Sequence, residues 1–311
     1  MKAFILAAGF GSRLKPITND IPKPLIPVLN VPSICYPLAL LREAGIQSVI
    51  CNVHYHADRI RHFFSESSES GLDVHISEEP EILGTGGGLK LCEQLLDDEP
   101  FLLINSDIIA DFNLQSFIDA HRQSGRPGSL MLYKTPAARS IGDVGLHNGE
   151  VRDFRNMLGT GLRSDYIYAG AAVLGPSIFR YLKSEFSSIV DTGFTGLISN
   201  ESLGCFLHNG FWHDIGTPES YWRANTLNRN TTLAIAQRIS AQVGMKPEMV
   251  SPDAYISPDA TVRESVIGSR CRIGEGSVLH QSVVLPGTAV ENGTVLEQCI
   301  AFPGGRLSPE E

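Results

Sequence analysis

The stretch "LAAGFGSRLKPITNDIPKPLIPV" spans residues 6–28 and joins an apolar run to a glycine loop and a cluster of cations and prolines. The apolar run "FILAA" at 4–8 has the composition of a buried strand, and Gly9 and Gly11 follow it. Glycines here let the backbone approach a phosphate and point N–H groups at it, although a plain tight turn explains two glycines equally well. The residues that follow must decide between the two.

The cations on this loop favour a phosphate site. Arg13 offers a planar fork of donors for bidentate phosphate contact, and Lys23 supplies a compact point charge. Pro22 and Pro24 restrict the backbone on both sides of Lys23, which suits a side chain that is held in place before a ligand arrives. Lys15 is either a third cation of the site or an ordinary solvated charge.

Strand-like apolar runs alternate with amphipathic helical patterns through the first two-thirds of the chain. The expected strands lie at 4–8, 48–53, 73–77, 101–107 and 129–134, and the expected helices at 33–44, 57–66, 86–97 and 113–124. This alternation predicts an α/β domain with a Rossmann-like, doubly wound and mostly parallel sheet. The segment 140–215 is more irregular, with short strands expected at 150–154, 166–174 and 205–209, and residues 218–243 predict one or two helices.

The character of the chain changes from residue 250 onward. Aliphatic residues recur six apart and, after a slip of one residue, continue at the same spacing: Val250, Ile256 and Val262, then Ile267, Ile273, Leu279 and Leu285. So short a repeat in a segment rich in glycine, proline and β-branched residues predicts a small parallel β-helix of nine steps in three coils.

Composition limits the classes of partner. The net charge of −9 argues against a general nucleic-acid or membrane-surface binder. Six scattered cysteines without a C-x-x-C pair predict free thiols in a reducing, cytoplasmic compartment. The N-terminal apolar run is too short for a signal peptide or a membrane span, and the polar run "SESSES" at 65–70 predicts a solvated loop.

Residues 6–28 resemble the signature of the sugar-phosphate nucleotidyltransferases, L-A-A-G-x-G-x-R-L-x-P-x-T-x-x-x-P-K-P-L-x-P-V, at every fixed position. The resemblance is nearest to mannose-1-phosphate guanylyltransferase-like members, and the hexad segment resembles the left-handed β-helix that some members append. It implies a catalytic domain at 1–230, a helical linker at 231–249, a β-helix at 250–302 and a tail at 303–311.

The resemblance implies an activity. These enzymes join a nucleoside triphosphate to a sugar 1-phosphate and release pyrophosphate, so positioning and electrostatic stabilisation supply most of the catalysis. In the family, the arginine that matches Arg13 serves the triphosphate and the leaving pyrophosphate, and the lysine that matches Lys23 contacts phosphate at the reacting centre. The nucleotide contacts implied for the first loop are Leu6, Ala7, Ala8, Gly9 and Gly11.

A divalent cation is expected, because two or three protein cations cannot neutralise the charges of a triphosphate and a sugar phosphate. The resemblance places Mg²⁺ on Asp107, at the end of "FLLINSD", and on Asp214 in "WHDIGTP". An aspartate that only caps a helix or a turn is the alternative for both. Asp111 in "DFN" is a weaker metal candidate, since it fits a helix cap.

The loop "EPEILGTGGGLK" at 79–90 frames the nucleobase in the family, which makes Glu79, Gly84, Thr85 and Gly86 candidates for base and ribose contacts. Consecutive glycines at the start of a helix cost stability unless something approaches closely. A merely permissive loop is the alternative reading.

On the sugar side, the resemblance points to Asp143, Gly145, Tyr168, Ala169 and Gly170. Many members also carry a Glu-Lys-Pro whose lysine grips the sugar phosphate. This chain has "DFRNML" instead, and Arg155 is the candidate substitute.

Three histidines fit structural roles better than functional ones. His54 and His56 in "NVHYHAD" fit a structural place at a strand end better than a metal pair. His280 lies on the hexad segment, where an acyltransferase would use a histidine, but three coils are too few for the acyl-donor cleft.

These observations favour a sugar-1-phosphate nucleotidylyltransferase. Its expected transfer is guanylyl or uridylyl, onto mannose, heptose or N-acetylmuramate 1-phosphate, and it is expected to form a homo-oligomer through the β-helix. Two alternatives stay open: an inactive relative that only binds nucleotide-sugars, and a metal-dependent glycosyltransferase. The second would not need the arrangement of Arg13 and Lys23.

Overall fold

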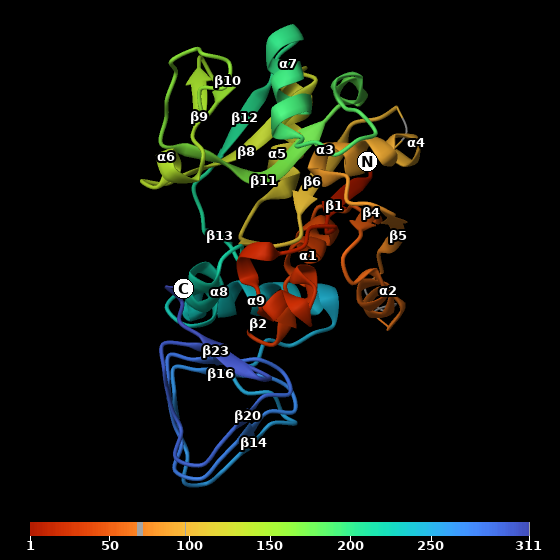
Figure 1. Cartoon of the computed structure of the whole chain (residues 1–311). Coiled ribbons are helices and arrows are strands. Elements are labelled where there is room, and N and C mark those ends of the chain that lie inside the picture. The colour runs from red at the N-terminus through yellow and green to blue at the C-terminus, as the bar shows by residue number, and fades with distance from the viewer. Residues whose placement is uncertain (67–70, 97, 311) are drawn as a thin grey trace. The chain divides into compact units, whose positions relative to one another are not determined.

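The computed structural model describes residues 1–66, 71–96 and 98–310 of the 311-residue chain (Figure 1). By its internal contacts the chain forms two compact units, each assembled from separated segments. Unit 1 comprises Met1–Gly9, Leu40–Ser106 and Asp111–Trp212, and unit 2 comprises Phe10–Ala39, Asp107–Ala110 and His213–Glu311. The domain borders expected near residues 230 and 250 follow chain order, whereas these units do not.

Unit 1 is built on a nine-stranded sheet with the order β5-β4-β1-β6-β11-β8-β12-β10-β9. Its strands are β1 (Ala3–Leu6), β4 (Ser48–Val53), β5 (Asp73–Glu78), β6 (Phe101–Asn105), β8 (Gly128–Lys134), β9 (Val144–His147), β10 (Glu150–Phe154), β11 (Tyr166–Leu174) and β12 (Gly204–His208). The run β5-β4-β1-β6 is parallel, as is the pair β8-β12. The fold class is therefore confirmed.

The sheet is more mixed than the sequence predicts. Strand β11 runs antiparallel to β6 and β8, and β10 runs antiparallel to β12 and β9. Asn148 and Gly149 join β9 to β10 with φ of 51° and 75°. A two-residue turn with both φ values positive closes only an antiparallel hairpin, so local turn chemistry overrides the βαβ pattern here.

Helices pack against this sheet, and α5 contacts β8 and β12 while α7 contacts β10. Asn113 caps α5, because its Oδ1 accepts from Ser116 N–H at 2.9 Å.

The helix expected at 86–97 breaks at Cys92, and residue 97 and the stretch 67–70 of the expected loop lie outside the described residues. The helices are α2 (Ala57–Glu66), α3 (Gly84–Leu91), α4 (Glu93–Leu96), α5 (Leu114–Ser124), α6 (Ala138–Ile141) and α7 (Thr195–Asn200), with a 3₁₀ turn at Pro176–Tyr181 and a π turn at Val190–Phe194, while α1 (Cys35–Glu43) continues from unit 2 into unit 1.

Unit 2 begins with a loop that is folded without long elements. The loop contains 3₁₀ turns at Ser12–Leu14, Ile17–Asn19 and Lys23–Leu25 and the short strands β2 (Pro27–Val28) and β3 (Val31–Pro32). The later elements of unit 2 before the β-helix are β7 (Ile108–Ala110), β13 (Trp212–Asp214, which begins in unit 1), α8 (Pro218–Asn225) and α9 (Arg229–Val243). Helix α8 supports the loop, because Tyr221 Oη donates to Pro27 O at 2.7 Å and Asn225 Oδ1 accepts from Leu29 N–H at 2.8 Å.

The C-terminal part of unit 2 is a parallel β-helix with three faces, which Figure 1 shows in cross-section. Its faces are β14 (Tyr255–Ile256), β17 (Arg272–Ile273) and β20 (Ala289–Val290); β15 (Thr261–Arg263), β18 (Val278–His280) and β21 (Val295–Glu297); and β16 (Val266–Ile267), β19 (Val283–Val284) and β22 (Ile300–Phe302). Strand β23 (Gly305–Leu307), inside the expected tail, pairs antiparallel with β22 and ends the stack.

Each coil has 17 residues rather than three full steps of six. Thr261 pairs with Val278, Val278 pairs with Val295, and Ile267 pairs with Val284, so the predicted step at Leu285 is wrong by one residue. The short step recurs at the same corner, where Glu264, Gln281 and Gln298 adopt φ of 50°, 47° and 46°. Amide hydrogen bonds between these three side chains tie one coil to the next.

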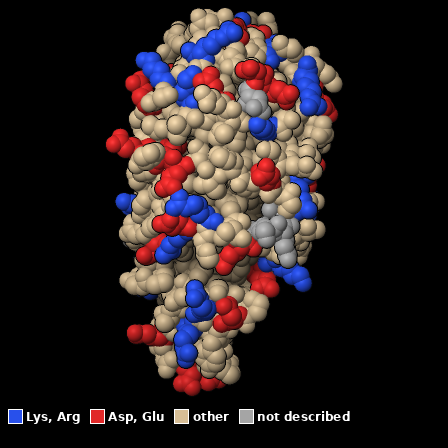
Figure 2. All heavy atoms as spheres, turned by 90° about the vertical axis from the view of Figure 1, so that its right-hand side faces the viewer, with Lys and Arg blue, Asp and Glu red and all other residues tan. Residues whose placement is uncertain are grey.

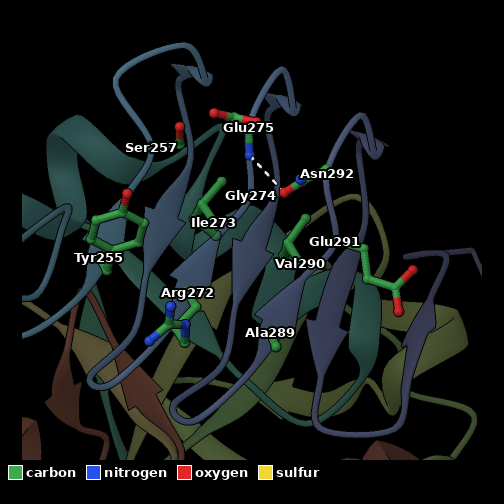
Figure 3. A pocket seen from close by; sticks show the side chains of 10 residues that line it. All are labelled: Tyr255, Ser257, Arg272, Ile273, Gly274, Glu275, Ala289, Val290, Glu291 and Asn292. Carbon is green, nitrogen blue, oxygen red and sulfur yellow. Dashed lines mark hydrogen bonds between the residues drawn. The ribbon is translucent and has the colours of Figure 1, made fainter.

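A shallow hollow of about 290 Å³ lies on the β14-β17-β20 face (Figure 3). The Arg272 guanidinium stacks over the Tyr255 ring at 5.5 Å, and Glu275 N–H donates to Asn292 Oδ1 at 3.0 Å, so these polar groups contact one another. They join successive coils, and we assign the hollow a structural role.

Among the described residues, charged side chains of both signs are interspersed over the face drawn in Figure 2. Among the described helices, none is both long and apolar enough to cross a membrane.

Leu279 and Val278 provide a matched test of the β-helix register. Leu279 is fully buried in the coil interior, whereas the Val278 side chain points outward and is 40% exposed. We expect Leu279→Ala to lower the free energy of unfolding by about 2–5 kcal/mol, and Val278→Ala by less than about 1 kcal/mol. Urea unfolding followed by Trp222 fluorescence in a Trp212→Phe background measures both, and equal losses would contradict the register.

Candidate active site

Four charged residues, drawn from all three segments of unit 2, form one cluster, the acid–base cluster: Arg13, Lys23, Asp107 and Asp214. The Lys23 ammonium forms an ion pair with Asp107 Oδ2, and both side chains are largely buried. Burial raises the pKa of the Asp214 carboxyl, the Asp107 charge raises it further, and Lys23, His213 and Arg13 act against this. The two carboxylates are therefore close enough to repel each other, with cations beside them.

The backbone around Lys23 is held by local hydrogen bonds. Lys23 opens a 3₁₀ turn in which Leu25 N–H donates to Pro22 O at 2.8 Å. Ser33 Oγ donates to the carbonyl oxygens of Lys23 and Pro24 at 3.1 and 3.0 Å. This geometry agrees with the expectation that the segment between Pro22 and Pro24 is rigid.

The "WHDIGTP" motif has a local structural explanation. Thr217 caps α8 in a capping box with Ser220, and Pro218 takes the first helical position. A Cβ on Gly216 would lie 2.8 Å from Arg13 Nη2 and 2.9 Å from Asp214 Oδ2, so both side chains rest against this glycine. Ile215 N–H donates to Asp107 O at 3.1 Å, which joins the two segments that carry the aspartates.

The cluster fits a divalent cation that is shared with a substrate. Within the described residues, no group of three or more His, Cys, Asp or Glu side chains could hold a metal by itself. Mg²⁺ is commonly bound by one or two carboxylates together with substrate phosphates. Two mutually repelling carboxylates, Asp107 and Asp214, match that donor set, and a bound cation would relieve the repulsion.

The first glycine loop divides into an open and a closed part. A Cβ on Gly9 in unit 1 would meet none of the described residues within 4 Å, so their packing does not require glycine there. Gly11 in unit 2 has φ of +61°, and a Cβ there would lie 2.8 Å from Thr18 Cγ2. Before them, Ala7 and Ala8 are buried and Leu6 is half-buried.

The second glycine loop, at the start of α3 in unit 1, is filled by the chain itself. A Cβ on Gly84 would lie 2.5 Å from Ser187 O, one on Gly86 2.6 Å from Ser187 Oγ, and one on Gly87 2.2 Å from Glu185 O. Gly86 N–H donates to Ser187 O at 2.8 Å, and Thr85 Oγ1 accepts from Ile189 N–H at 2.9 Å. The close approach that these glycines permit is therefore that of segment 185–189.

Glu79 is 1% exposed, and both of its carboxylate oxygens have internal partners. Oε1 accepts from Asn52 Nδ2 at 2.6 Å, and Oε2 accepts from Leu83 N–H at 2.8 Å. Its contact with a nucleobase stays a prediction. Asn52 is a residue that sequence reasoning missed, although an amide inside the apolar run "SVICNV" is a recognisable signal.

The two arginines of the sugar-side region, also in unit 1, have different partners. Arg155 is exposed, has φ of 50° and lies 3.7 Å from Asp191 Oδ1. Arg163, which sequence reasoning missed, places Nε 3.0 Å from Oδ2 of the buried Asp143. Asp153 anchors the loop between them, because its carboxylate accepts from Leu158 N–H at 3.0 Å and Thr160 N–H at 3.1 Å.

The remaining sugar-side candidates lie in packed surroundings. A Cβ on Gly145 would lie 2.9 Å from both Asp153 Cβ and Leu162 O. The Tyr168 ring stands edge-on to Phe194, and burial raises the pKa of its phenol. Gly170, with φ of +80°, lies where the β11–β8 register shifts, next to the buried Ala169, so a bulge explains this glycine.

Other weighed residues have partners outside the acid–base cluster. Asp111 Oδ1 lies 3.1 Å from His208 Nε2 in unit 1, and His54 Nδ1 lies 2.8 Å from Glu79 O. His280 lies between Glu264 and Glu297 on the β-helix, at 3.7 and 3.8 Å.

Comparison with known families agrees with this arrangement. Residues 2–231 match the family model described as nucleotidyl transferase, and residues 235–306 match the model described as GlmU-like, C-terminal hexapeptide. Together these two models account for the α/β part and the β-helix of the chain.

Named relatives and solved structures are similar over most of their length. Probable mannose-1-phosphate guanylyltransferase 3 of Oryza sativa subsp. japonica is 30% identical over 89% of this chain and 82% of its own. The catalytic subunit beta of mannose-1-phosphate guanylyltransferase from Danio rerio is 31% identical, covering 84% and 74%. HddC from Yersinia pseudotuberculosis, solved with GMP-PN, has a TM-score of 0.60 at 25% identity, covering 72% and 97%. A putative glucose-1-phosphate thymidylyltransferase from Bacillus anthracis, at 24% identity and a TM-score of 0.67, shares the fold over 74% of this chain and 96% of its own.

The raised pKa of Asp214 predicts a pH-dependent effect of Asp214→Asn in metal-free protein. Because the folded pKa lies above the unfolded one, wild-type stability falls as pH rises through the window between them. We expect the substitution to remove this loss, so that the variant is more stable than wild type at about pH 8 and the gap closes near about pH 4.

Thermal unfolding across this pH range measures the gap, and a gap independent of pH would contradict the assignment. At neutral pH, Mg²⁺ is expected to stabilise the wild type and to have little effect on the variant.

Proposed function

Because the chain belongs to the nucleotidyl transferase family and is a sugar-phosphate nucleotidyltransferase, we propose that it transfers a guanylyl or uridylyl group to a sugar 1-phosphate. The favoured acceptors are mannose, heptose and N-acetylmuramate 1-phosphates. Relatives named mannose-1-phosphate guanylyltransferase, and a similar solved structure that contains GMP-PN, support a guanine nucleotide.

The observation that carries the proposal is the acid–base cluster. In the proposed reaction an oxygen of the sugar phosphate attacks the α-phosphorus, a bond forms between them, and the bond to pyrophosphate breaks. Negative charge grows on the α-phosphate oxygens and on pyrophosphate, so cations held nearby stabilise the transition state more than the ground state. Arg13 is assigned to the triphosphate and the leaving pyrophosphate, and Lys23 to phosphate at the reacting centre.

A divalent cation, proposed to be Mg²⁺, would be held by Asp107 and Asp214 and would neutralise phosphate charge. Lys23 forms an ion pair with Asp107, so the proposed cation site adjoins a cation of the protein.

The test is a grid of triphosphates against sugar 1-phosphates, read as pyrophosphate release with and without a chelator. We expect metal-dependent turnover in at least one combination, with GTP or UTP. Lys23→Ala and Asp107→Asn should each lower kcat/KM by at least about 100-fold, comparable to the loss of an oxyanion contact. Asp111→Asn is the control: Asp111 lies four positions after Asp107 but beside His208. This substitution should change kcat/KM by less than about 3-fold.

The same grid separates the alternatives. A glycosyltransferase would release no pyrophosphate from a triphosphate and a sugar 1-phosphate. A relative that only binds nucleotide-sugars would show binding without turnover in every combination. Little change in both Lys23→Ala and Asp107→Asn would overturn the site assignment.

We further propose self-association of two copies through the β15-β18-β21 face. Val278 and Val295 stand outward on this face and are 40% and 58% exposed. Arg263, His280 and Glu297 occupy equivalent positions of the three strands and form a second row on this face. The row has the positive Arg263 at one end and the negative Glu297 at the other. A two-fold axis along the middle strand would place Arg263 of each copy opposite Glu297 of the other, Val278 opposite Val278, and Val295 opposite Thr261.

Charge reversal tests this face. Arg263→Glu should raise the dissociation constant of the dimer by about 10-fold or more, because like charges then face each other, and adding Glu297→Arg should restore it to within about 3-fold. Sedimentation equilibrium measures the constant, and monomeric wild type or failure of the double variant would contradict the proposal.

We also propose a cytoplasmic location, supported by the six free cysteines.

A further inference from the structure

A buried amide–carboxylate pair lies at the end of the parallel strands of unit 1. Asn52, in β4, is 2% exposed, and Glu79, directly after β5, is 1% exposed. Asn52 Nδ2 donates to Glu79 Oε1 at 2.6 Å. Within the described chain, the side-chain hydrogen bonds of both residues go to groups outside the acid–base cluster, so the proposed mechanism leaves the pair without a role.

The pair is the middle of a chain of three hydrogen bonds between two loops. At one end, Asn52 Oδ1 accepts from Ala7 N–H at 2.9 Å, at the residue that follows β1 and starts the first glycine loop. At the other end, Glu79 Oε2 accepts from Leu83 N–H at 2.8 Å, at the residue that precedes α3 and the second glycine loop. The Ala7 contact also fixes the amide, since Asn52 must present its oxygen to that N–H.

Helix α3 closes the pair from a third direction. A Cβ on Gly88 would lie 2.3 Å from Glu79 Oε1 and 2.7 Å from Asn52 Nδ2, so the helix backbone packs directly on both groups. Buried polar groups in such a packed place have no access to replacement partners, and leaving one unpaired costs about 1–3 kcal/mol. The directions of the three hydrogen bonds are therefore strongly determined.

We propose that Asn52 and Glu79 are positioning residues that set the backbone of the two glycine loops for the nucleoside triphosphate. This inference rests on the proposed function and on the sequence-based expectation that residues 7–9 and 84–86 contact the nucleotide. It assigns Glu79 an action through Leu83 N–H, without contact to the base. Preorganised loops lower the cost of binding, so the pair should affect the triphosphate and leave the sugar 1-phosphate unaffected.

Single substitutions break the hydrogen-bond pattern in different ways. Asn52→Asp places a carboxylate oxygen against Glu79 Oε1. Glu79→Gln leaves one acceptor oxygen for two donors, Asn52 Nδ2 and Leu83 N–H. We expect each to raise KM for the triphosphate, or lower kcat/KM for it, by about 10- to 100-fold, the loss that follows from one unpaired buried group. KM for the sugar 1-phosphate should change by less than about 3-fold.

The double variant Asn52→Asp/Glu79→Gln is the decisive arm. The new carboxylate accepts from Ala7 N–H and from the new glutamine amide, whose oxygen accepts from Leu83 N–H. All three contacts are then satisfied with the negative charge moved from position 79 to position 52. We expect recovery of KM for the triphosphate to within about 3-fold of wild type, a non-additive result that independent damage would not give.

Glu78→Gln is the matched control, because Glu78 adjoins Glu79, is half exposed and pairs with Arg61 on the surface. It should leave both KM values unchanged. Melting temperatures of all variants identify losses due to global unfolding. Unchanged single variants, equal effects on both substrates, or a double variant as poor as the worse single variant would overturn the inference.

Failure of the proposed function would be recognised separately, as wild type without turnover in any combination of substrates. The same proteins are then titrated with GTP and Mg²⁺ by calorimetry. Weaker binding in the single variants with recovery in the double variant supports the inference, and equal binding, or no binding by wild type, overturns it.

Discussion

The repulsion between two neighbouring carboxylates, Asp107 and Asp214, is the constraint around which the acid–base cluster of unit 2 is organised. Burial and the charge of Asp107 both raise the pKa of Asp214, and the neighbouring Lys23, His213 and Arg13 lower it. Lys23 is supplied by a 3₁₀ turn, and Arg13 rests with Asp214 against Gly216. The capping box of α8, the hydrogen bond from Ile215 to Asp107 and the support of the loop by Tyr221 all serve to hold these charges together.

Glycine in a loop that binds a phosphate can have several physical causes, and this chain contains three of them. Around Gly9, none of the described residues lies within 4 Å of the position that a Cβ would occupy, so a ligand has room to approach this backbone. Gly11 combines a left-handed backbone with a close contact to Thr18. The glycines at 84, 86 and 87 accommodate segment 185–188, and Gly88 accommodates Asn52 and Glu79. A glycine-rich pattern therefore indicates close approach without saying which molecule or segment approaches.

The sequence was most informative where local rules determine structure. The runs at 48–53, 150–154 and 166–174 form strands with the predicted bounds, because apolar, β-branched and aromatic residues there fit a buried sheet. Strand direction beyond β6 was not predictable from alternation, since it depends on turns such as Asn148–Gly149. In the sequence, the 17-residue coil shows only as one five-residue step among the six-residue steps. The corner residues Glu264, Gln281 and Gln298 adopt a left-handed backbone that is typical of glycine, and none of them is glycine, so the sequence does not mark the corner.

Candidate site residues divide along the same line. Arg13, Lys23, Asp107 and Asp214 belong to contiguous motifs, and the structure gathers all four in unit 2. Asn52 instead acts through partners 45 and 27 positions away in the sequence, Ala7 and Glu79. Arg163 likewise depends on Asp143, which belongs to a different segment. No local pattern encodes such pairings.

The division into units also separates general chemistry from selectivity. The charges that would act on phosphates, which every substrate pair of this reaction shares, lie in unit 2 with the β-helix. The residues expected to contact the base and the sugar lie in unit 1, where the second glycine loop, Arg155 and Arg163 are held by Asp143, Asp191 and segment 185–189. We therefore expect changes among these unit 1 residues to alter the choice of substrate while the acid–base cluster stays the same.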